Sequence, residues 1–558
     1  MTAEPPGAGS VAGAGGSADS AGPDTASAAG PDTASAAGPD TASAAGPDTA
    51  SAAGPDTASA AGPDTDGLPV AETPTASLIP VMTQICGAAG VVSDPRDLAT
   101  YECDGLTSHR TAPGLVVLPE TAGQVAAVVR ACAGAGVPFV ARGSGTGLSG
   151  GALPRSDGVL VVTSRMRKIL DIDPVSRRAI VEPGVTNLSV SKAVEPYGFF
   201  YAPDPSSQVV CSVGGNVAEN SGGAHCLKHG FTVHHVTGLE IVTPDGELVW
   251  LGDGTGASAG YDLLGAFTGS EGTLGIATKI VVKLTPLPEA VSCLLAAFDS
   301  TSQGGTAVSS IIAAGIVPAA IEMMDALAIE AAEAAVHCNY PEGAGAVLVV
   351  ELDGPAADVQ RDRAAVHELC QQAGAGEIRI ADDPAERAVI WAGRKSAFAA
   401  VGRISPAYIV QDGVVPRTAL SKVLARIAEL SDGAEGVRVA NVFHAGDGNL
   451  HPLVLFDDSI AAAGQAAEEV SGQILDLCIE AGGSITGEHG VGVDKSRYMT
   501  RMFGADDLDT MQMLRCAFNP RNLCNPGKVF PTPRLCGEVP GVRRAPHPAV
   551  AAGEGDLF

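Results

Sequence analysis

The sequence has few aromatic residues, no long hydrophobic run and no CxxC pair. Phe, Trp and Tyr make up 4% of its 558 residues, and no stretch approaches the roughly 18 apolar residues that a transmembrane helix needs. Residues 1–6 lack the basic and apolar segments of a secretory leader. The twelve cysteines therefore predict neither a secreted disulfide framework nor a bound iron–sulfur cluster. We expect a cytoplasmic protein with reduced cysteines.

Positive charge is also scarce. The formal net charge is −29, and the first 75 residues contain acids but no lysine or arginine. Such a chain repels nucleic-acid phosphates and acidic membrane surfaces. We therefore expect no nucleic-acid partner, and a small anionic substrate would need cations placed locally around it.

The N-terminal segment consists of octamer repeats. The sequence AGPDTASA begins at Ala21, and AGPDT begins again at Ala29, Ala37, Ala45, Ala53 and Ala61. Each repeat contains a proline and has only alanine as an apolar side chain, so burial cannot offset the entropy of ordering. We predict that residues 1–76 are a disordered tail that can be deleted without loss of activity.

A glycine-rich stretch, ARGSGTGLSGG at residues 141–151, follows a predicted strand, helix and strand over residues 113–142. Its bare backbone N–H groups can converge on an oxyanion such as a pyrophosphate. Gly145, Gly147 and Gly150 fit the G-x-G-x-x-G pattern of dinucleotide-binding folds. That pattern should open a helix, whereas here ALPRSDG and the strand-like VLVVT follow. We therefore expect a nucleotide-binding loop between two strands and no NAD-type site.

Two further glycine-rich stretches follow downstream. Residues 213–230 read VGGNVAENSGGAHCLKHG, and residues 268–275 read TGSEGTLG before a predicted strand. His225, Cys226 and His229 could ligate a metal, but no CxxC motif accompanies them to complete such a site. A flat cofactor lying against flexible backbone explains these glycines better.

A late cluster carries the residues suited to catalysis. NVFHAGDGNLHPLVLF predicts two apolar strands joined at AGDGN, with His444 ending one strand and His451 entering the other. Across a hairpin the two imidazoles can face the same side. SITGEHGVG then places Glu488 and His489 between glycines. Two histidines and a carboxylate suit a catalytic Zn²⁺ site, although two histidines near a DG turn are often incidental.

The motifs RGSGTGLSGG, PDPSS, GGNVAENSGG and TGSEGTLG closely resemble the FAD-binding domain of the vanillyl-alcohol oxidase and p-cresol methylhydroxylase family. The resemblance implies an α+β fold, with two α/β subdomains around FAD at residues 77–289 (core 111–289). It also implies an α/β substrate cap with a C-terminal segment returning to the flavin at residues 290–535, and a tail at 536–558. Relatives that bind FAD covalently have histidine near the place of Thr146, so FAD should be non-covalent. The implied FAD-binding residues are Arg142, Gly143, Ser144, Gly145, Thr146, Gly147, Ser149, Gly150, Pro203, Asp204, Ser207, Gly214, Gly215, Asn216, Glu271, Gly272, Ile276 and Asn525.

HAGDGNLHP, GEHGVG, NPGK and WAGRKSAF resemble the 2-hydroxy-acid dehydrogenase branch of that family, and most closely the flavin subunit of bacterial glycolate oxidase. The resemblance implies a divalent metal, with Zn²⁺ the first candidate, on His444, His451 and Glu488. It also implies a base at His489 and a partner for the substrate carboxylate at Arg394. Electrons would pass to a separate iron–sulfur subunit and a second flavin subunit, which could hold the chain at the inner membrane.

Several alternatives stay open from the sequence. Glycolate and D-lactate differ by one methyl group, which is worth only about 1–3 kcal/mol in an apolar pocket. A dicarboxylate such as D-2-hydroxyglutarate is less expected, because residues 408–411 lack the lysine that such enzymes use. A non-catalytic electron-transfer subunit is a third possibility, but it should lack the histidine and glutamate cluster.

Overall fold

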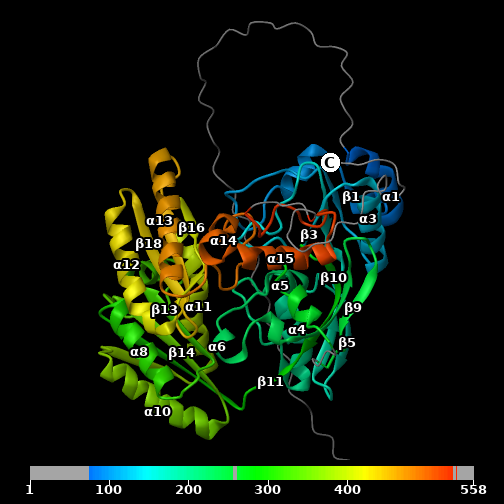
Figure 1. Cartoon of the computed structure of the whole chain (residues 1–558). Coiled ribbons are helices and arrows are strands. Elements are labelled where there is room, and N and C mark those ends of the chain that lie inside the picture. The colour runs from blue at the N-terminus through cyan, green and yellow to red at the C-terminus, as the bar shows by residue number, and fades with distance from the viewer. Residues whose placement is uncertain (1–73, 256–259, 532–535, 537–558) are drawn as a thin grey trace, which may run out of the picture. The chain divides into compact units, whose positions relative to one another are not determined.

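The computed structural model describes residues 74–255, 260–531 and 536, and residues 70–558 form one compact unit. The octamer repeats and the expected C-terminal tail beyond residue 536 lie outside the described residues. Within that unit, elements from the first part of the chain and from residues 290–456 build separate sheets (Figure 1). These sheets correspond to the predicted α+β fold class.

The first subdomain is a four-stranded sheet of order β1-β2-β4-β3. Strands β2, β4 and β3 are parallel to one another, and β1 pairs antiparallel at the edge. The predicted strand–helix–strand unit is confirmed as β2, α3 and β3. The elements are α1 (Ile79–Cys86), β1 (Val91–Val92), α2 (Pro95–Leu98), β2 (Leu115–Val117), α3 (Ala122–Ala135), β3 (Phe139–Arg142) and β4 (Val159–Val162).

Helix α3 begins at the predicted cap. The Thr121 hydroxyl accepts a 3.2 Å hydrogen bond from the backbone N–H of Gln124. The Gln124 amide oxygen accepts from the N–H of Glu120 at 2.6 Å, one residue before the position that a reciprocal capping box uses. The helix ends at Gly136, which has a left-handed φ of 66°.

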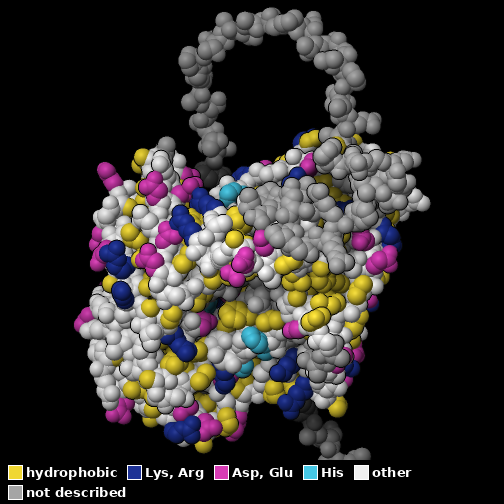
Figure 2. Space-filling model, viewed as in Figure 1, with side chains coloured by type: hydrophobic (Ala, Val, Ile, Leu, Met, Phe, Trp, Pro, Cys, Tyr) yellow, Lys and Arg dark blue, Asp and Glu magenta, His cyan; other side chains and the backbone are white. Residues whose placement is uncertain are grey.

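The second subdomain is an antiparallel sheet of order β5-β6-β10-β8-β9. Its outer strand β9 leaves Leu248, Val249 and Trp250 exposed, and hydrophobic side chains gather in this region of Figure 2. The elements are β5 (Ile169–Asp173), β6 (Arg178–Val181), α4 (Asn187–Val194), β7 (Phe199–Phe200), α5 (Val213–Glu219), α6 (Cys226–His229), β8 (Val236–Val242), β9 (Leu248–Gly252), α7 (Leu263–Phe267), β10 (Ile276–Lys283) and β11 (Thr285–Pro286).

The predicted cap is an eight-stranded antiparallel sheet, in which β17 pairs with β19 beside the main path β15-β12-β14-β13-β18-β19-β16. Helices α8, α10, α12 and α13 pack on one face, and α9 and α11 pack on the other. Because both faces are covered, β12 and β14 are nearly continuous apolar runs. The strands are β12 (Ala290–Phe298), β13 (Ala320–Asp325), β14 (Ala346–Gly354), β15 (Glu377–Ala381), β16 (Ala407–Val410), β17 (Gly413–Val414), β18 (Val437–His444) and β19 (Asn449–Phe456). The helices are α8 (Thr301–Ala313), α9 (Ala326–Val336), α10 (Ala356–Gln372), α11 (Pro384–Ala400), α12 (Leu420–Gly433) and α13 (Ala461–Glu480).

The chain then returns to the first subdomain through α14 (Met499–Met502) and α15 (Ala505–Phe518). The backbone N–H of Phe139 in β3 donates to Leu523 O at 2.8 Å, and Asn525 N donates back to Phe139 O at 2.8 Å. Cys516 and Cys536 form a disulfide, so the expectation of fully reduced cysteines is wrong for this pair. No helix among the described residues is both long enough and apolar enough to cross a membrane.

Candidate functional site

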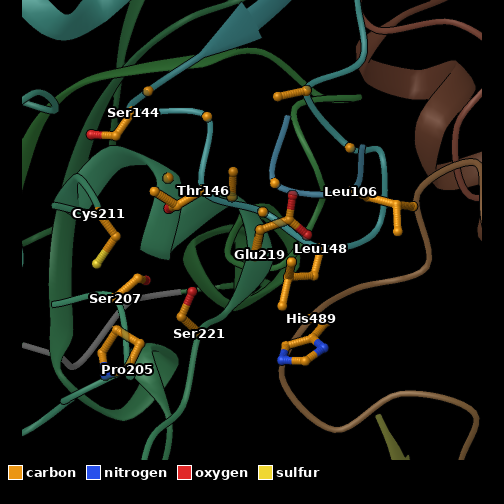
Figure 3. Close-up of a pocket in the computed structure, with 18 of the residues that line it drawn as sticks. Leu106, Ser144, Thr146, Leu148, Pro205, Ser207, Cys211, Glu219, Ser221 and His489 are labelled. Atoms are coloured by element: carbon orange, nitrogen blue, oxygen red, sulfur yellow. The ribbon is translucent and has the colours of Figure 1, made fainter. Parts of the chain in front are cut away.

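One cavity of about 1040 Å³ joins the predicted flavin-binding stretches to α11 and to the Glu488–His489 loop. In Figure 3, Ser144, Thr146 and Leu148 lie along one side, and His489 approaches from a segment opposite Pro205, Ser207 and Ser221. Most of the predicted FAD-binding residues line it, namely Arg142, Gly143, Ser144, Gly145, Thr146, Gly147, Ser207, Gly214, Gly215, Asn216, Glu271, Gly272 and Ile276. Pocket volumes for drug-sized ligands run to about 1,000 Å³, so this cavity has room for a large cofactor.

The other five predicted FAD-binding residues do not line the cavity and instead hold its walls. Ser149 O accepts from the N–H groups of Val493 and Asp494. Asn187 Nδ2 donates to Pro203 O, the Asp204 carboxylate contacts His225, and Asn525 Nδ2 donates to Gly151 O and Glu271 O. Gly150 packs on Val493.

The first glycine-rich stretch joins β3 to β4 without a helix, as predicted. A Cβ atom at Gly143 would lie 2.1 Å from the hydroxyl oxygen of Ser212, so only glycine allows the loop to pack this closely. The Arg142 guanidinium donates to Cys103 O at 2.6 Å, and burial lowers the pKa of this side chain. The loop therefore presents backbone groups and one cation to the cavity.

The second glycine-rich stretch differs from the prediction, because residues 213–219 form helix α5. The Ser212 hydroxyl caps the helix by accepting from Gly215 N at 3.3 Å. Val213 and Val217 are fully buried in the core of the second subdomain. Capping and burial thus outweigh the cost of two glycines in the first turn.

The third stretch contacts the segment that follows Glu488 and His489. The Glu271 carboxylate accepts hydrogen bonds from Val491 N at 2.7 Å and Gly492 N at 2.6 Å. Both donors lie more than 200 residues downstream, next to His489. Glu271 therefore acts on the loop that carries His489 as well as lining the cavity.

Glu219 lies at the centre of the cavity wall and was not among the predicted residues (Figure 3). A Cβ atom at Gly151 would lie 2.5 Å from Glu219 Oε1, and one at Gly490 would lie 2.2 Å from Oε2. Burial and the nearby Glu271 raise the pKa of Glu219 well above its usual value. This carboxyl therefore fills the gap between the first loop and the Glu488–His489 loop.

A segment before β2 also lines the cavity and was missed. Leu106, Thr107, Ser108 and Arg110 all contribute to the wall. A Cβ atom at Gly105 would lie 2.7 Å from Gly147 O, so this segment packs directly on the first loop. The Asp104–Gly105 turn was its only sequence signal.

The predicted hairpin is confirmed as β18 and β19. His444 pairs in register with Asn449, and His451 pairs with Val442, so the two histidines are diagonal neighbours on one face. Their ring centroids are 5.0 Å apart. Glu488 Oε1 lies 3.4 Å from His444 Nε2 and 3.2 Å from His451 Nε2. The structure thus brings together all three predicted metal ligands.

A buried carboxylate that the sequence did not reveal holds the Glu488–His489 loop. Asp412 accepts from the backbone N–H of Gly487 and His489, each at 2.9 Å, and from the Thr486 hydroxyl at 2.6 Å. Asp412, His451 and His489 also have ligand atoms close enough to hold a metal. His451 is therefore shared by two possible ligand sets.

Glu322 is a second unpredicted carboxylate, fully buried on β13. Its Oε1 lies 2.7 Å from His444 Nδ1, and its Oε2 accepts from Arg394 Nε at 2.7 Å. Carboxylates that orient a ligating histidine in this way are usual around metals. Burial lowers the pKa of His444, but the neighbouring Glu322 outweighs burial and leaves it raised well above its usual value.

Arg394 does not line the cavity, because its guanidinium is buried against Glu322. It lies behind Phe398, with 5.9 Å from Cζ to that ring. Phe398 in turn lies 5.6 Å from the His451 ring and lines the cavity together with Lys395. The predicted carboxylate partner is thus one layer behind the surface, and Lys395 is a cation that the prediction omitted.

His489 lines the cavity and is stacked on His451, with ring centroids 5.0 Å apart. Burial lowers its pKa to about 4, below the usual value of a histidine. Its imidazole is therefore neutral at pH 7 and has a ring nitrogen able to accept a proton.

Comparison with known proteins identifies the class. Residues 113–252 match the FAD binding domain, and residues 287–529 match the C-terminal domain of FAD linked oxidases. The chain is 53% identical over 448 residues to the glycolate oxidase subunit GlcD of Escherichia coli K12, covering 80% of this chain and 90% of that protein. It is 37% identical to GlcD of Bacillus subtilis, covering 80% of this chain and 96% of that protein.

A more distant sequence relative and two solved structures of similar fold also match. The D-lactate dehydrogenase of Anaerostipes hadrus is 32% identical, covering 75% of this chain and 90% of that enzyme. Among solved structures, p-cresol methylhydroxylase has a TM-score of 0.70 at 16% identity and covers 83% of this chain and 98% of its own. The 4-ethylphenol oxidase of Gulosibacter chungangensis has a TM-score of 0.69 at 19% identity and covers 84% and 99%.

The fold and the matched domains define an FAD-linked oxidoreductase. The chain belongs to the FAD-linked oxidase family that includes the GlcD subunits and the D-lactate dehydrogenases.

Proposed function

We propose that this chain oxidises a small 2-hydroxy acid, glycolate before others, to the corresponding 2-oxo acid. The observation that carries the proposal is a single cavity in which the flavin-binding stretches face both Glu488 and His489. The 53% identity to a glycolate oxidase subunit supports glycolate over D-lactate, since the D-lactate dehydrogenases are more distant. Relatively few contacts need to change to admit the extra methyl group of lactate.

The residues present fit a bound FAD. The Arg142–Gly147 loop lines the cavity and supplies N–H groups and a cation suited to phosphates. When bound, FAD supplies the acceptor for two electrons and the hydrogen from C2 of the substrate. With threonine at position 146, we propose that the flavin is held non-covalently.

The His444, His451 and Glu488 cluster fits a divalent cation. Glu488 Oε2 is a buried atom for which the described part of the chain offers no hydrogen-bond partner, and Glu488 Oε1 faces the Nε2 atoms of both histidines. Imidazole nitrogens with a carboxylate are a donor set for Zn²⁺ and similar cations. A cation bound there would supply Lewis acidity that lowers the pKa of the substrate hydroxyl. Glu322 would orient His444 toward it.

In this proposal His489 takes the proton from the substrate hydroxyl. It is the histidine of the cluster that lines the cavity, and its low pKa leaves it unprotonated at neutral pH. Arg394 is the proposed partner of the substrate carboxylate, and Phe398 separates it from the cavity. Reaching it requires the Phe398 ring to move.

We further propose that electrons leave through separate subunits, an iron–sulfur protein and a second flavin protein. The relatives in E. coli and B. subtilis are named as subunits, and the exposed strand β9 is a surface available for such contacts. A cytoplasmic location at the face of the inner membrane follows from this arrangement and stays a prediction.

Turnover of the purified chain with an artificial dye acceptor tests the function. We expect activity with glycolate, lower activity with D-lactate and very little with D-2-hydroxyglutarate. Higher activity with D-lactate than with glycolate would make D-lactate the assigned substrate. Absence of turnover with every 2-hydroxy acid would refute the proposal.

A further inference from the structure

The junction between the flavin-binding half and the cap contains a histidine shared by two carboxylates. His225 precedes α6, and its Nδ1 lies 2.7 Å from Asp204 Oδ2 on the flavin side. Its Nε2 lies 3.0 Å from Glu351 Oε1 on β14 of the cap. Both ring nitrogens face carboxylate oxygens, so an imidazolium, in which both nitrogens donate, satisfies both contacts.

The cap side of this contact continues into α11. Trp391 Nε1 donates to the second oxygen of Glu351 at 2.6 Å, and the Trp391 ring stacks on His225 at 5.9 Å between centroids. One turn further along α11, Lys395 lies over the same tryptophan and lines the cavity with Phe398.

The flavin side of the contact continues into the opposite wall. Asp204 also accepts from the backbone N–H of His225 at 3.2 Å. The three residues that follow it, Pro205, Ser206 and Ser207, line the cavity; Figure 3 shows Pro205 and Ser207 across from His489. A continuous set of contacts therefore joins one wall to the other.

We propose that His225 is a positioning residue that, as an imidazolium bonded to Asp204 and Glu351, fixes helix α11 relative to the Pro205–Ser207 wall and so sets the width of the substrate end of the cavity. The mechanical part of this proposal concerns the chain alone. Its kinetic consequence rests on the proposed function, because α11 carries Arg394, Lys395 and Phe398.

The charge balance at the junction favours the imidazolium. Burial lowers the pKa of His225, but Asp204 and Glu351 outweigh burial and leave it raised well above its usual value. A raised pKa means that the contact contributes fully below the unfolded-state pKa of histidine, about 6.5, and is lost as the pH rises through the folded-state value. Other charged or titratable groups near this junction are Lys228, Cys226 and His229 on α6, Asp353 on β14, Cys293 on β12 beside Glu351, and Lys395 on α11.

Lys228 forms a neighbouring contact that does not reach α11. Its amine pairs with the Asp353 carboxylate and donates to Asp353 O at 2.8 Å. It holds α6 on β14 when His225 is changed. A His225 substitution should therefore loosen α11 without separating the two halves.

Hydrogen exchange of α11 and steady-state kinetics test this role in the FAD-loaded protein. In His225→Gln we expect faster amide exchange across residues 384–400 at pH 7. We also expect a KM for glycolate raised about tenfold, because bonds to a charged group are lost, with kcat changed less than about threefold. The control is His234→Gln, since His234 is exposed and bonds only within its own turn. Exchange and KM equal to wild type in His225→Gln would overturn the proposal.

Glu351→Gln supplies a readout that a purely structural contact would not move. In the wild type we expect α11 to lose protection, relative to the intrinsic exchange rate at each pH, and KM to rise as His225 deprotonates. Glu351→Gln keeps an oxygen for Trp391 but removes one charge from beside His225, so both changes should shift to lower pH. An unshifted profile would overturn the proposal, and this variant decides if His225→Gln fails to fold. If the wild type oxidises no 2-hydroxy acid, the proposed function fails, while the exchange data still judge the positioning role.

Discussion

The Asp412 carboxylate accepts a 2.9 Å hydrogen bond from the backbone N–H of His489, which lies 77 residues further along the chain. Lys495 Nζ is 3.4 Å from the same oxygen. Burial raises the pKa of Asp412, but the neighbouring His489 and Lys495 outweigh it and leave the pKa below its usual value. Asp412 is therefore ionised throughout the working pH range and fixes the loop on which Glu488 and His489 lie.

Asp412→Asn should disrupt this loop. An amide offers one acceptor oxygen to several donors and turns its NH₂ toward them, and each bond to a charged acceptor is worth about 1.5–3 kcal/mol. We expect a lower melting temperature and a turnover reduced at least about tenfold, with FAD still bound. The exposed Asp432→Asn on α12 is the control.

Because the pKa of Asp412 is lowered in the folded protein, the stabilisation that its charge provides should be present above the unfolded-state pKa and fade only in strong acid. Wild-type turnover in Asp412→Asn would show that the loop is held by other contacts.

His489→Ala tests the proton-accepting role. The variant should keep FAD and metal, since His489 is not among the proposed ligands, and should lose about 10²- to 10⁴-fold in kcat, the usual contribution of a general base. Flavin absorbance and metal analysis on the same sample check the retained groups. A rate near wild type from about pH 6 to 9 would be incompatible with this role.

His444→Ala tests the cation site. Removing one of the three proposed ligands should reduce bound metal to trace level and raise the KM, whereas FAD content should not change because His444 does not line the cavity. Elemental analysis by mass spectrometry measures the metal, and His234→Ala is the matched control. Full activity of wild-type protein after chelator treatment would mean that the cluster is structural.

Arg394→Lys and Lys395→Met distinguish the two candidate partners of the substrate carboxylate. Lysine at 394 keeps a charge beside buried Glu322 but cannot form the paired contacts of a guanidinium. We expect its KM for glycolate to rise about tenfold or more, and that of Lys395→Met to change less than about threefold. The reverse order would assign the carboxylate to Lys395.

Gly143→Ala tests the packing of the first loop. The added methyl would meet the Ser212 hydroxyl, so the loop or the cap of α5 must shift, and FAD affinity should fall measurably in a fluorescence titration. Gly134→Ala is the control, because nothing lies within 4 Å of a Cβ there and alanine in helix α3 should stabilise the protein by about 0.5–1 kcal/mol. Unchanged FAD affinity in Gly143→Ala would show that the loop tolerates the shift.

Local sequence patterns predicted the elements that depend on local signals. The strand–helix–strand unit around α3 followed from periodicity and the Thr121 cap, and the β18–β19 hairpin followed from two apolar runs around a DG turn. The side-by-side placement of His444 and His451 then required only the two-residue period of a strand. The predicted absence of a helix after the first glycine-rich loop is also confirmed, because it followed from the adjacent sequence ALPRSDG and VLVVT.

Features that depend on distant residues could not be predicted. Glu322 and Asp412 are single acids in apolar strands or turns, and their partners lie 122 and 77 residues away. Helix α5 was missed because Gly214 and Gly215 are poor helix formers locally, whereas burial of Val213 and Val217 decides the structure. The position of Arg394 behind Phe398 likewise depends on its pairing with Glu322, which no motif reveals.

Anaerobic addition of glycolate to the purified, FAD-loaded chain tests the central claim most directly. We predict that the absorbance of the oxidised flavin is lost within one turnover, with one glyoxylate formed per flavin reduced. Flavin that stays oxidised in the presence of glycolate and of D-lactate would contradict the account.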